Sequence, residues 1–227
     1  MIRISHPLRL DTPLYPGTPG PEVVPFCSLA AGDSSNASLF LVHSHSGTHL
    51  DAPRHFCPDG ATVADLCGGE IVLEPVISLD IATAADARIG PEHIQSSGGV
   101  PADIRGLLLR TGWSRYRETD SSRYLAHNPW IDPDLPAWLR EEYPELRLFG
   151  TDTISIATAS RREEGRACHR AFLCEKPPIL LLEDLDLTSA TLPGRRLRLR
   201  IIPWIVAPVD GVPVTAFLVD TGRSCEE

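Results

Sequence analysis

The sequence has no apolar run that approaches the roughly 20 residues a helix needs to cross a bilayer. Its first residues, MIRISHPLRLDTPLYPG, lack the apolar core and the cleavage site of a secretory signal peptide. An excess of positive charge is also missing, because 30 acidic residues outnumber 21 basic ones and give a net charge of −9. We therefore expect a cytoplasmic protein whose main partner is neither nucleic acid nor a membrane, since both attract basic surfaces.

The cysteines follow no pattern of a disulfide framework or a zinc site. They lie far apart without any CxxC pair, at Cys27, Cys57, Cys67, Cys168, Cys174 and Cys225. A reducing cytoplasm keeps such thiols free, so the sequence predicts no disulfide. No cysteine lies in a recognisable nucleophile motif, which disfavours a cysteine–histidine hydrolase.

Internal repeats, low-complexity tracts and long linkers are absent, so residues 1–227 are expected to form one domain. The 21 prolines are spread throughout and favour short strands and turns over long helices. Short apolar or alternating runs predict seven strands: 38–44, 71–79, 106–111, 145–150, 178–183, 196–202 and 214–220.

Two segments have the pattern of a helix. One is 90–97, with Gly98 and Gly99 at its end, and the other is 132–143. Asp210-Gly211 predicts a turn between the last two strands. Strands outnumber helices in mixed order, which predicts a single α/β domain with a mixed β-sheet core and few helices.

One short segment concentrates histidine. The stretch HSHSGTHLDAPRHF, residues 43–56, holds four of the eight histidines. A lone histidine is more often a hydrogen-bonded surface or core residue than a ligand, and we expect this of His6, His93 and His127. Packing within a strand is expected of His43, with contact to a metal-binding side chain as the alternative. The other histidines of the segment and its aspartate share odd numbers, so one face of a strand would carry them: His45, His49, Asp51 and His55.

The spacing within this segment decides whether it can bind a metal ion. A straight strand would hold His45 and His49 about 13 Å apart at about 3.3 Å per residue. That distance is too long for two ligands of an ion bound at about 2 Å. Gly47 allows backbone angles that other residues avoid, so the chain can curl and bring the two histidines together. Three nitrogen and oxygen ligands beside an open position are typical of a catalytic metal site.

The segment HSGTHLDAPRHF resembles the HxGTHxDxPxHF signature of the cyclase family of metal-dependent hydrolases, which includes bacterial kynurenine formamidases and isatin hydrolases. Further segments agree in order along nearly the whole chain: DTPLYPGTP (11–19), GTDTISI (150–156), CHRAFLCEKPPILLLEDLDL (168–187) and PVDGVPVTAFLV (208–219). The resemblance implies the family's swivelling β/β/α-like fold, hydrolysis of an amide C–N bond, and a homo-oligomer such as a dimer or tetramer.

The motif match implies two divalent ions per subunit, with ligands from three segments: His45, His49, Asp51, His169 and Glu183. Asp51 and Glu183 would each bridge both ions. The interval from His169 to Glu183 is longer than in the family, which leaves Glu175 as the alternative carboxylate. Histidine and carboxylate ligands suit Zn²⁺, the expected ion, and Mn²⁺ alike.

The same match implies the residues that act on the substrate. His55 matches the family's acid/base histidine, which would protonate the leaving amine while a metal-activated water attacks the carbonyl carbon. Tyr15 stands where formamidases carry a tryptophan that contacts the substrate ring, and Ala157 stands where the family usually has an aspartate.

Two other functions remain open at this point. Because Tyr15 replaces the formamidase tryptophan, a cyclic amide or lactone, as in isatin hydrolases, is the alternative substrate to an aromatic formamide. A non-catalytic metal- or ligand-binding module is the second alternative. The presence of His55 disfavours it, because binding alone needs no proton donor.

Overall fold

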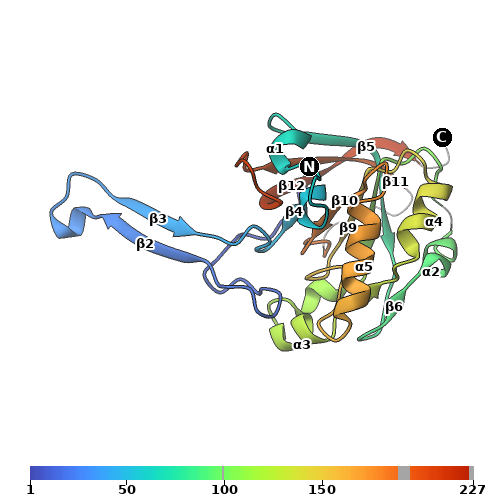
Figure 1. The fold of residues 1–227 in the computed structure, drawn as a ribbon, viewed down its shortest axis with the longest axis horizontal. Helices are drawn as coiled ribbons and strands as arrows, with labels where there is room; N and C mark the ends of the chain where they lie inside the picture. Colours follow the sequence, from blue (N-terminus) through green and yellow to red (C-terminus); the bar gives the residue numbers. More distant parts are fainter. Residues whose placement is uncertain (99, 189–194, 225–227) are drawn as a thin grey trace.

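The computed structural model describes residues 1–98, 100–188 and 195–224 (Figure 1). Gly99 and Cys225, named above, lie outside these residues. In the described part of the chain, no helix is both long enough and apolar enough to span a membrane.

The helices are short and the strands numerous. The α-helices are α1 (Val63–Leu66), α2 (Pro91–Gln95), α3 (Ser121–Ala126), α4 (Leu135–Glu142) and α5 (Arg162–Leu173). Single 3₁₀ turns cover Leu29–Ala31, Pro53–His55 and Trp113–Tyr116. The strands are β1 (Ile2–Arg3), β2 (Glu22–Cys27), β3 (Ala37–Leu41), β4 (His49–Asp51), β5 (Ile71–Asp80), β6 (Arg88–Ile89), β7 (Gly106–Arg110), β8 (Trp130–Ile131), β9 (Leu148–Thr151), β10 (Leu180–Glu183), β11 (Arg195–Pro203) and β12 (Gly211–Ser224).

The core is an eight-stranded sheet in the order β1-β12-β11-β5-β7-β9-β10-β4. Strand β4 also pairs with β12, so the sheet closes on itself as a barrel. The pairs β5–β7, β7–β9 and β9–β10 are parallel and the others antiparallel. The prediction of a single α/β domain with a mixed sheet and few helices is therefore confirmed, and the closure of the sheet adds to it.

The alternating pattern of RLRLRII explains how β11 fits this barrel. Its apolar residues Leu197, Leu199 and Ile201 are fully buried in the barrel interior. Between them, Arg198 and Arg200 point outward and form ion pairs with Glu74 of the neighbouring strand β5 and with Glu70 just before it. The period of two thus places one face in the core and one in water.

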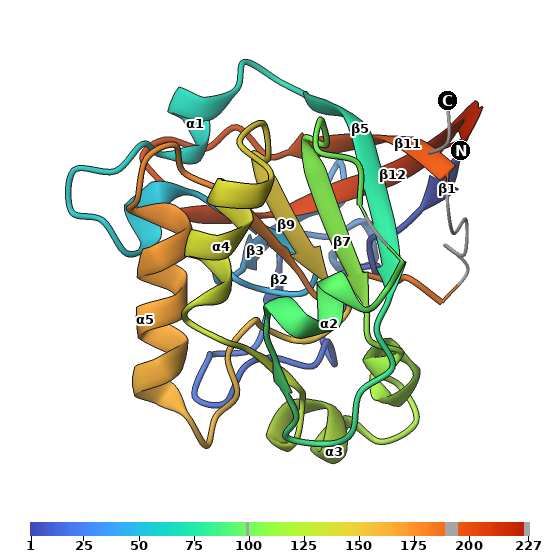
Figure 2. The same cartoon turned by 90° about the vertical axis from the view of Figure 1, so that its right-hand side faces the viewer.

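Helices α2, α4 and α5 cover the outer face of the parallel strands (Figure 2). Their apolar side chains form a second core with the sheet; examples are Ile94, Leu139 and Phe172. Six predicted strands match observed ones: 71–79 is β5, 106–111 is β7, 145–150 is β9, 178–183 is β10, 196–202 is β11 and 214–220 is β12. The two predicted helices match α2 and α4. Helix α5 was missed, because its sequence REEGRACHRAFL is mostly polar and contains a glycine.

The predicted strand 38–44 has a different environment from the one expected. Its observed part, β3, pairs only with β2, and the two form a hairpin that projects from the body of the molecule (Figure 1). Residues 22–41, which we call the arm, are almost entirely exposed. His43 follows β3 in a loop, so the prediction that it packs in a strand is wrong.

The prediction that all cysteines are free is also wrong. Cys57 and Cys174 form a disulfide with their Cα atoms 5.6 Å apart, although 117 residues separate them in sequence. The fold brings the segment after His55 against the end of α5, and sequence spacing gives no sign of this contact. The other cysteines in the described residues, Cys27, Cys67 and Cys168, are free.

A fully buried ion pair ties the loop after β7 to the end of β10. Arg117 donates from Nε and Nη2 to the two carboxylate oxygens of Asp184, at 2.8 and 2.7 Å. Tyr124 donates its hydroxyl to the same carboxylate at 2.5 Å, and Thr48 donates to the Asp184 carbonyl. Burial acts against the charge on Arg117, but the hydrogen bonds and the charge of Asp184 raise its pKa above the ordinary arginine value. Asp184 directly follows Glu183, so this network fixes a site residue.

We expect Arg117→Ala to lower the free energy of unfolding by about 3–5 kcal/mol, because it leaves the Asp184 carboxylate buried without its partner. Urea denaturation followed by circular dichroism measures this. The double variant R117M/D184N removes both charges and is expected to lose less. A single variant that unfolds at the wild-type urea concentration would contradict the assignment.

Candidate metal centre

The curl expected at Gly47 is present. Gly47 has a φ of +63°, in the left-handed region that favours glycine, and the His45 and His49 rings lie 5.0 Å apart between centroids. Gly211, at the start of β12, makes room for this arrangement. A Cβ atom there would come within 2.5 Å of His45 Cε1, so a larger residue would displace the histidine.

Three residues of this segment form one group of candidate ligand atoms. Asp51 Oδ1 lies 2.7 Å from His45 Nδ1 and 3.3 Å from His49 Nε2. His49 and Asp51 lie on β4, where a spacing of two places both on the same side of the strand. Both side chains are almost completely buried.

Two more residues reach the same place from distant parts of the chain. His169 lies on α5, and its Nε2 is 3.6 Å from Glu183 Oε1 and 3.9 Å from Asp51 Oδ2. Glu183 ends β10 directly across from His49 in the strand register, with Oε2 3.5 Å from His49 Nε2. Glu175, the alternative carboxylate, is exposed beyond the end of α5 and is not part of this cluster.

Hydrogen bonds fix the orientation of these side chains. His49 Nδ1 and His169 Nδ1 donate to the carbonyls of Gly47 and Gly165, at 2.8 and 2.7 Å. Each ring therefore directs its Nε2 atom toward the carboxylates, the orientation that metal-binding histidines have. Glu183 Oε1 accepts from Ser155 Oγ and from the backbone N–H of residue 156.

The donor set fits a metal ion. Candidate ligand atoms within 4.8 Å of one another form three groups: His45–His49–Asp51, Asp51–His169–Glu183 and His45–His55–Asp210. The first two share Asp51. Asp51 Oδ2 is buried and has no hydrogen-bond partner. A buried carboxylate oxygen without a partner costs free energy, and a cation beside it removes that cost. Two groups with a common carboxylate could hold two ions.

The charges of the cluster shift the pKa values of its histidines and of Asp51. Burial acts to lower the pKa of His45, but the Asp51 carboxylate and the hydrogen bond with Asp210 outweigh it and raise this pKa to about 10. The pKa values of His49 and His169 are also raised, because nearby carboxylates outweigh burial. For Asp51, burial is outweighed by His45 and His49, which hold its pKa well below the ordinary value.

His55 lies beside the cluster on the 3₁₀ turn that begins at Pro53. Its ring centroid is 3.9 Å from that of His45 and 6.1 Å from that of His169. The side chain is 26% exposed, so it faces both the cluster and the cavity. Phe56 follows it and stacks on the His169 ring at 4.8 Å.

Asp210 is a site residue that the sequence analysis missed. Its Oδ2 lies 2.9 Å from both His55 Nδ1 and His45 Nε2, so one oxygen links the acid/base candidate to a metal-ligand candidate. The hydrogen bonds from His45 and His55 hold the pKa of Asp210 well below its ordinary value. Asp210 falls in a segment that matched the family, PVDGVPVTAFLV, but its spacing from the histidines in sequence gives no sign of the contact.

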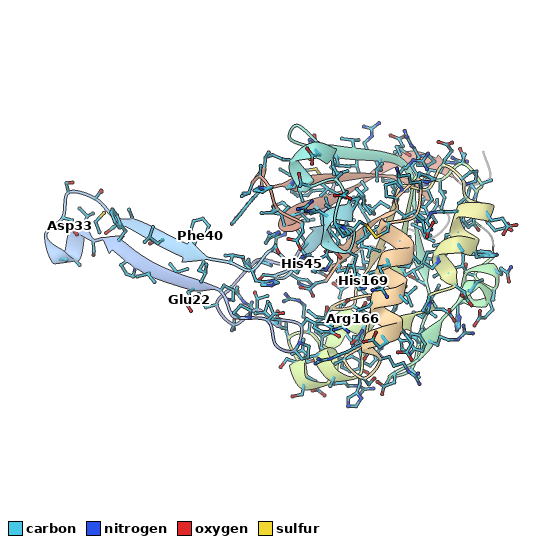
Figure 3. The ribbon with its side chains drawn as sticks, in the orientation of Figure 1. Glu22, Asp33, Phe40, His45, Arg166 and His169 are labelled. Carbon is cyan, nitrogen blue, oxygen red and sulfur yellow. A yellow bond between two sulfur atoms is a disulfide. The ribbon has the colours of Figure 1, made fainter. Side chains whose placement is uncertain are left out.

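A cavity of about 280 Å³ opens onto the cluster. Tyr15, His43, Phe56 and Ala157 line its walls, and Arg162 and Arg166 of α5 add positive charge, among other lining residues. Tyr15 is half-buried and packs against the cluster of Trp113, Tyr124 and Ile154. His43 lies in the cavity wall and not in the sheet core. Figure 3 shows His45 where the arm joins the body, with His169 and Arg166 on the facing helix.

The model of the Cyclase family matches residues 2–158. The chain belongs to this family. A kynurenine formamidase from Bacillus mycoides is 29% identical over 218 residues, which cover 96% of this chain and 96% of that protein. Isatin hydrolase A from Labrenzia aggregata, bound to benzyl benzoate, has a similar structure with a TM-score of 0.76 at 22% identity, over 96% of this chain and 93% of its own. A predicted metal-dependent hydrolase from Bacillus stearothermophilus gives a TM-score of 0.70 at 20% identity, over 95% of this chain and 96% of its own.

We expect metal binding to release protons and to weaken as the pH falls. Below the raised pKa of about 10, His45 of the metal-free protein carries a proton that must leave if its imidazole binds a cation. Titration calorimetry with Zn²⁺ between pH 6 and 8, in buffers that differ in ionisation enthalpy, measures the protons released. The variant H49A is expected to bind less metal per subunit. Zinc affinity that does not change with pH would contradict this site.

Proposed function

We propose that residues 1–227 form a single cytoplasmic hydrolase domain that cleaves an amide C–N bond with the help of divalent metal ions, as kynurenine formamidases do. The observation that carries the proposal is one cavity that joins a buried cluster of ligand-type side chains to a hydrogen-bonded histidine, His55. The proposed ligands are His45, His49, Asp51, His169 and Glu183. They would hold two Zn²⁺ ions per subunit, or Mn²⁺ in their place.

Bound divalent ions supply Lewis-acid catalysis, which polarises a carbonyl group and makes water more acidic. The residues of this chain provide the remaining functions. In the overall reaction water adds to the carbonyl carbon, the C–N bond breaks, and the nitrogen leaves as an amine that has gained a proton. His55 is the proposed donor of that proton, because an unprotonated amide nitrogen is a poor leaving group.

Asp210 is proposed as a positioning residue for His55. Its carboxylate accepts from His55 Nδ1, so the other ring nitrogen, Nε2, is left to exchange protons with the substrate. The same oxygen bonds to His45 Nε2, as carboxylates do behind metal-binding histidines. Tyr15 would cover the aromatic ring of the substrate and limit the entry of water.

The charge of the cavity favours a formamide that carries a carboxylate over neutral isatin. Arg162 lines the cavity from the first turn of α5, and Arg166 lies one turn later beside Glu163, its ion-pair partner. N-formylkynurenine has an α-carboxylate that Arg162 could bind. A cyclic amide or lactone hydrolase of the same family is the second candidate, favoured by Tyr15 in place of the formamidase tryptophan.

We expect His55→Ala to lower kcat on N-formylkynurenine roughly 100-fold or more, while bound metal stays at the wild-type level, because the proton donor is lost and the ligands are kept. Asp210→Asn is expected to lower kcat roughly 10- to 100-fold and to change the pH profile, because the carboxylate no longer orients His55. Metal content measured by atomic emission is the control. If His55→Ala lost its metal together with its activity, His55 would be a ligand and not the acid.

We expect Arg162→Gln to raise KM for N-formylkynurenine roughly 10-fold, because a hydrogen bond between charged groups contributes about 1.5 kcal/mol. Formanilide, which has the aryl formamide group without the carboxylate, is the matched control and is expected to show no change. Equal effects on both substrates would contradict recognition of the carboxylate. Wild-type protein that opens isatin faster than it cleaves either formamide would favour the second candidate.

A further inference from the structure

His43 lines the cavity but does not belong to the cluster of candidate ligands. It follows β3 where the arm joins the body, two residues before His45, which Figure 3 labels. None of the groups of candidate ligand atoms among the described residues includes it. Its ring centroid is 5.7 Å from that of His45, and the two ring planes are inclined by 53°. The ring therefore stands beside the cluster, in the wall of the space that a substrate would enter.

A hydrogen bond from the backbone determines which ring nitrogen of His43 carries the proton. The backbone N–H of His45 donates to His43 Nδ1 at 3.1 Å. A nitrogen that accepts uses its lone pair and has no hydrogen, so the proton of the neutral ring is on Nε2. This Nε2 makes no hydrogen bond with the described residues, and the ring lines the cavity. His43 thus offers the cavity one uncharged N–H donor whose direction is set by the backbone.

The polar side chains that line the cavity away from the cluster differ from His43 in charge or in freedom. Arg162 is a cation and suits an anionic group. Arg166 is already in an ion pair, and Ser155 donates its hydroxyl to a carboxylate of the cluster. The hydroxyl of Tyr15 can rotate to donate or to accept. An uncharged donor with a set direction is matched to an uncharged acceptor, such as a ketone oxygen.

The position of His43 relative to His55 indicates which part of a substrate it contacts. Both rings neighbour the ring of His45, at centroid distances of 5.7 and 3.9 Å, and both line the cavity. His55 is the proposed proton donor to the scissile nitrogen. A donor on a side chain this close to His55 reaches atoms close to that nitrogen. In an arylamide these atoms are the aromatic ring and the substituent ortho to the nitrogen.

We propose that His43 binds the substrate by donating from Nε2 to a carbonyl oxygen ortho to the scissile nitrogen. The inference rests on the proposed function and applies to both of its candidate substrates. N-formylkynurenine carries a ketone on the ring carbon next to the formamide, and isatin carries one at the corresponding ring carbon. The amide N–H of the formamide can donate to the same ketone, but a carbonyl oxygen has two lone pairs, so both bonds can form. The bond from His43 would fix the orientation of the aromatic ring relative to His55.

Two substitutions separate the roles of the two ring nitrogens of His43. His43→Asn places an amide oxygen near the position of Nδ1 and has no donor at the position of Nε2. Asparagine forms the same hydrogen bond to the backbone N–H two residues on, so this variant keeps the local turn. His43→Gln places an amide N–H near the position of Nε2 and is the matched control. Both side chains are uncharged, so neither changes the charge of the cavity.

The test compares kcat/KM of the zinc-loaded protein for ortho-acetylformanilide and for formanilide, which differ only in the ortho carbonyl group. We expect His43→Asn to lower the ratio of the two values roughly 3- to 10-fold, the effect of one hydrogen bond between neutral groups. His43→Gln is expected to keep the ratio within about 2-fold of the wild-type value. The change is expected in KM more than in kcat, because the bond is present both in the bound substrate and in the transition state.

The outcomes separate this role from a structural one. If His43→Asn lost activity equally on both compounds, or kept the wild-type ratio, His43 would only hold the loop before His45 and the inference would be overturned. If wild-type protein cleaved neither compound, the proposed function would fail, and the dissociation constants of the two compounds, measured by calorimetry, would provide the same ratio. A binding preference for the acetyl compound that is lost in His43→Asn would then support the contact, and its absence would overturn it.

Discussion

The backbone pairing of β4 is the constraint on which the rest of the site depends. This strand has only three residues, yet it pairs with β10 on one side and β12 on the other, and so closes the barrel. Its register with β10 sets Glu183 opposite His49, and its register with β12 sets Gly211 opposite Asp51. A shift of this register by one residue would turn every side chain of the strand to the other face. The pairing that closes the barrel therefore also brings the residues of the cluster together.

The buried charged side chains of the cluster need hydrogen-bond partners and compensating charge. The cluster is mostly buried, and the outward ring nitrogens of His49 and His169 and the Oε1 atom of Glu183 are bound by backbone groups or a hydroxyl. Burying carboxylates together is unfavourable unless positive charge accompanies them. In the metal-free state the carboxylates raise the pKa of His45 to about 10, so a proton on this ring provides part of the charge, and divalent ions would provide it when bound.

The sequence was sufficient to predict those parts of the structure that depend on local pattern. Alternation within RLRLRII predicted β11, and Gly47 predicted the curl that brings His45 and His49 together. The family motif led to His169 and Glu183, which lie in one cluster with Asp51, whereas their roles as ligands stay predictions. The contacts missed were long-range ones. Asp210 is 155 residues from His55 in sequence and Cys174 is 117 from Cys57, and neither residue type nor spacing encodes such a meeting. The exposure of the arm was missed for a related reason, because an apolar strand has the same sequence pattern whether its own chain covers it or solvent does.

The Cys57–Cys174 disulfide links two walls of the cavity covalently. It joins the segment after His55 to the residue that caps α5, and therefore ties the wall of the cavity at His55 to the helix that carries His169. Closing a loop of this length removes conformations from the unfolded chain, a stabilisation of about 4–5 kcal/mol in the chain-entropy model. In a reducing environment such a pair is kept reduced, and the non-covalent contacts then have to hold the two walls together. The oxidised and the reduced protein would therefore tolerate heat and proteases differently.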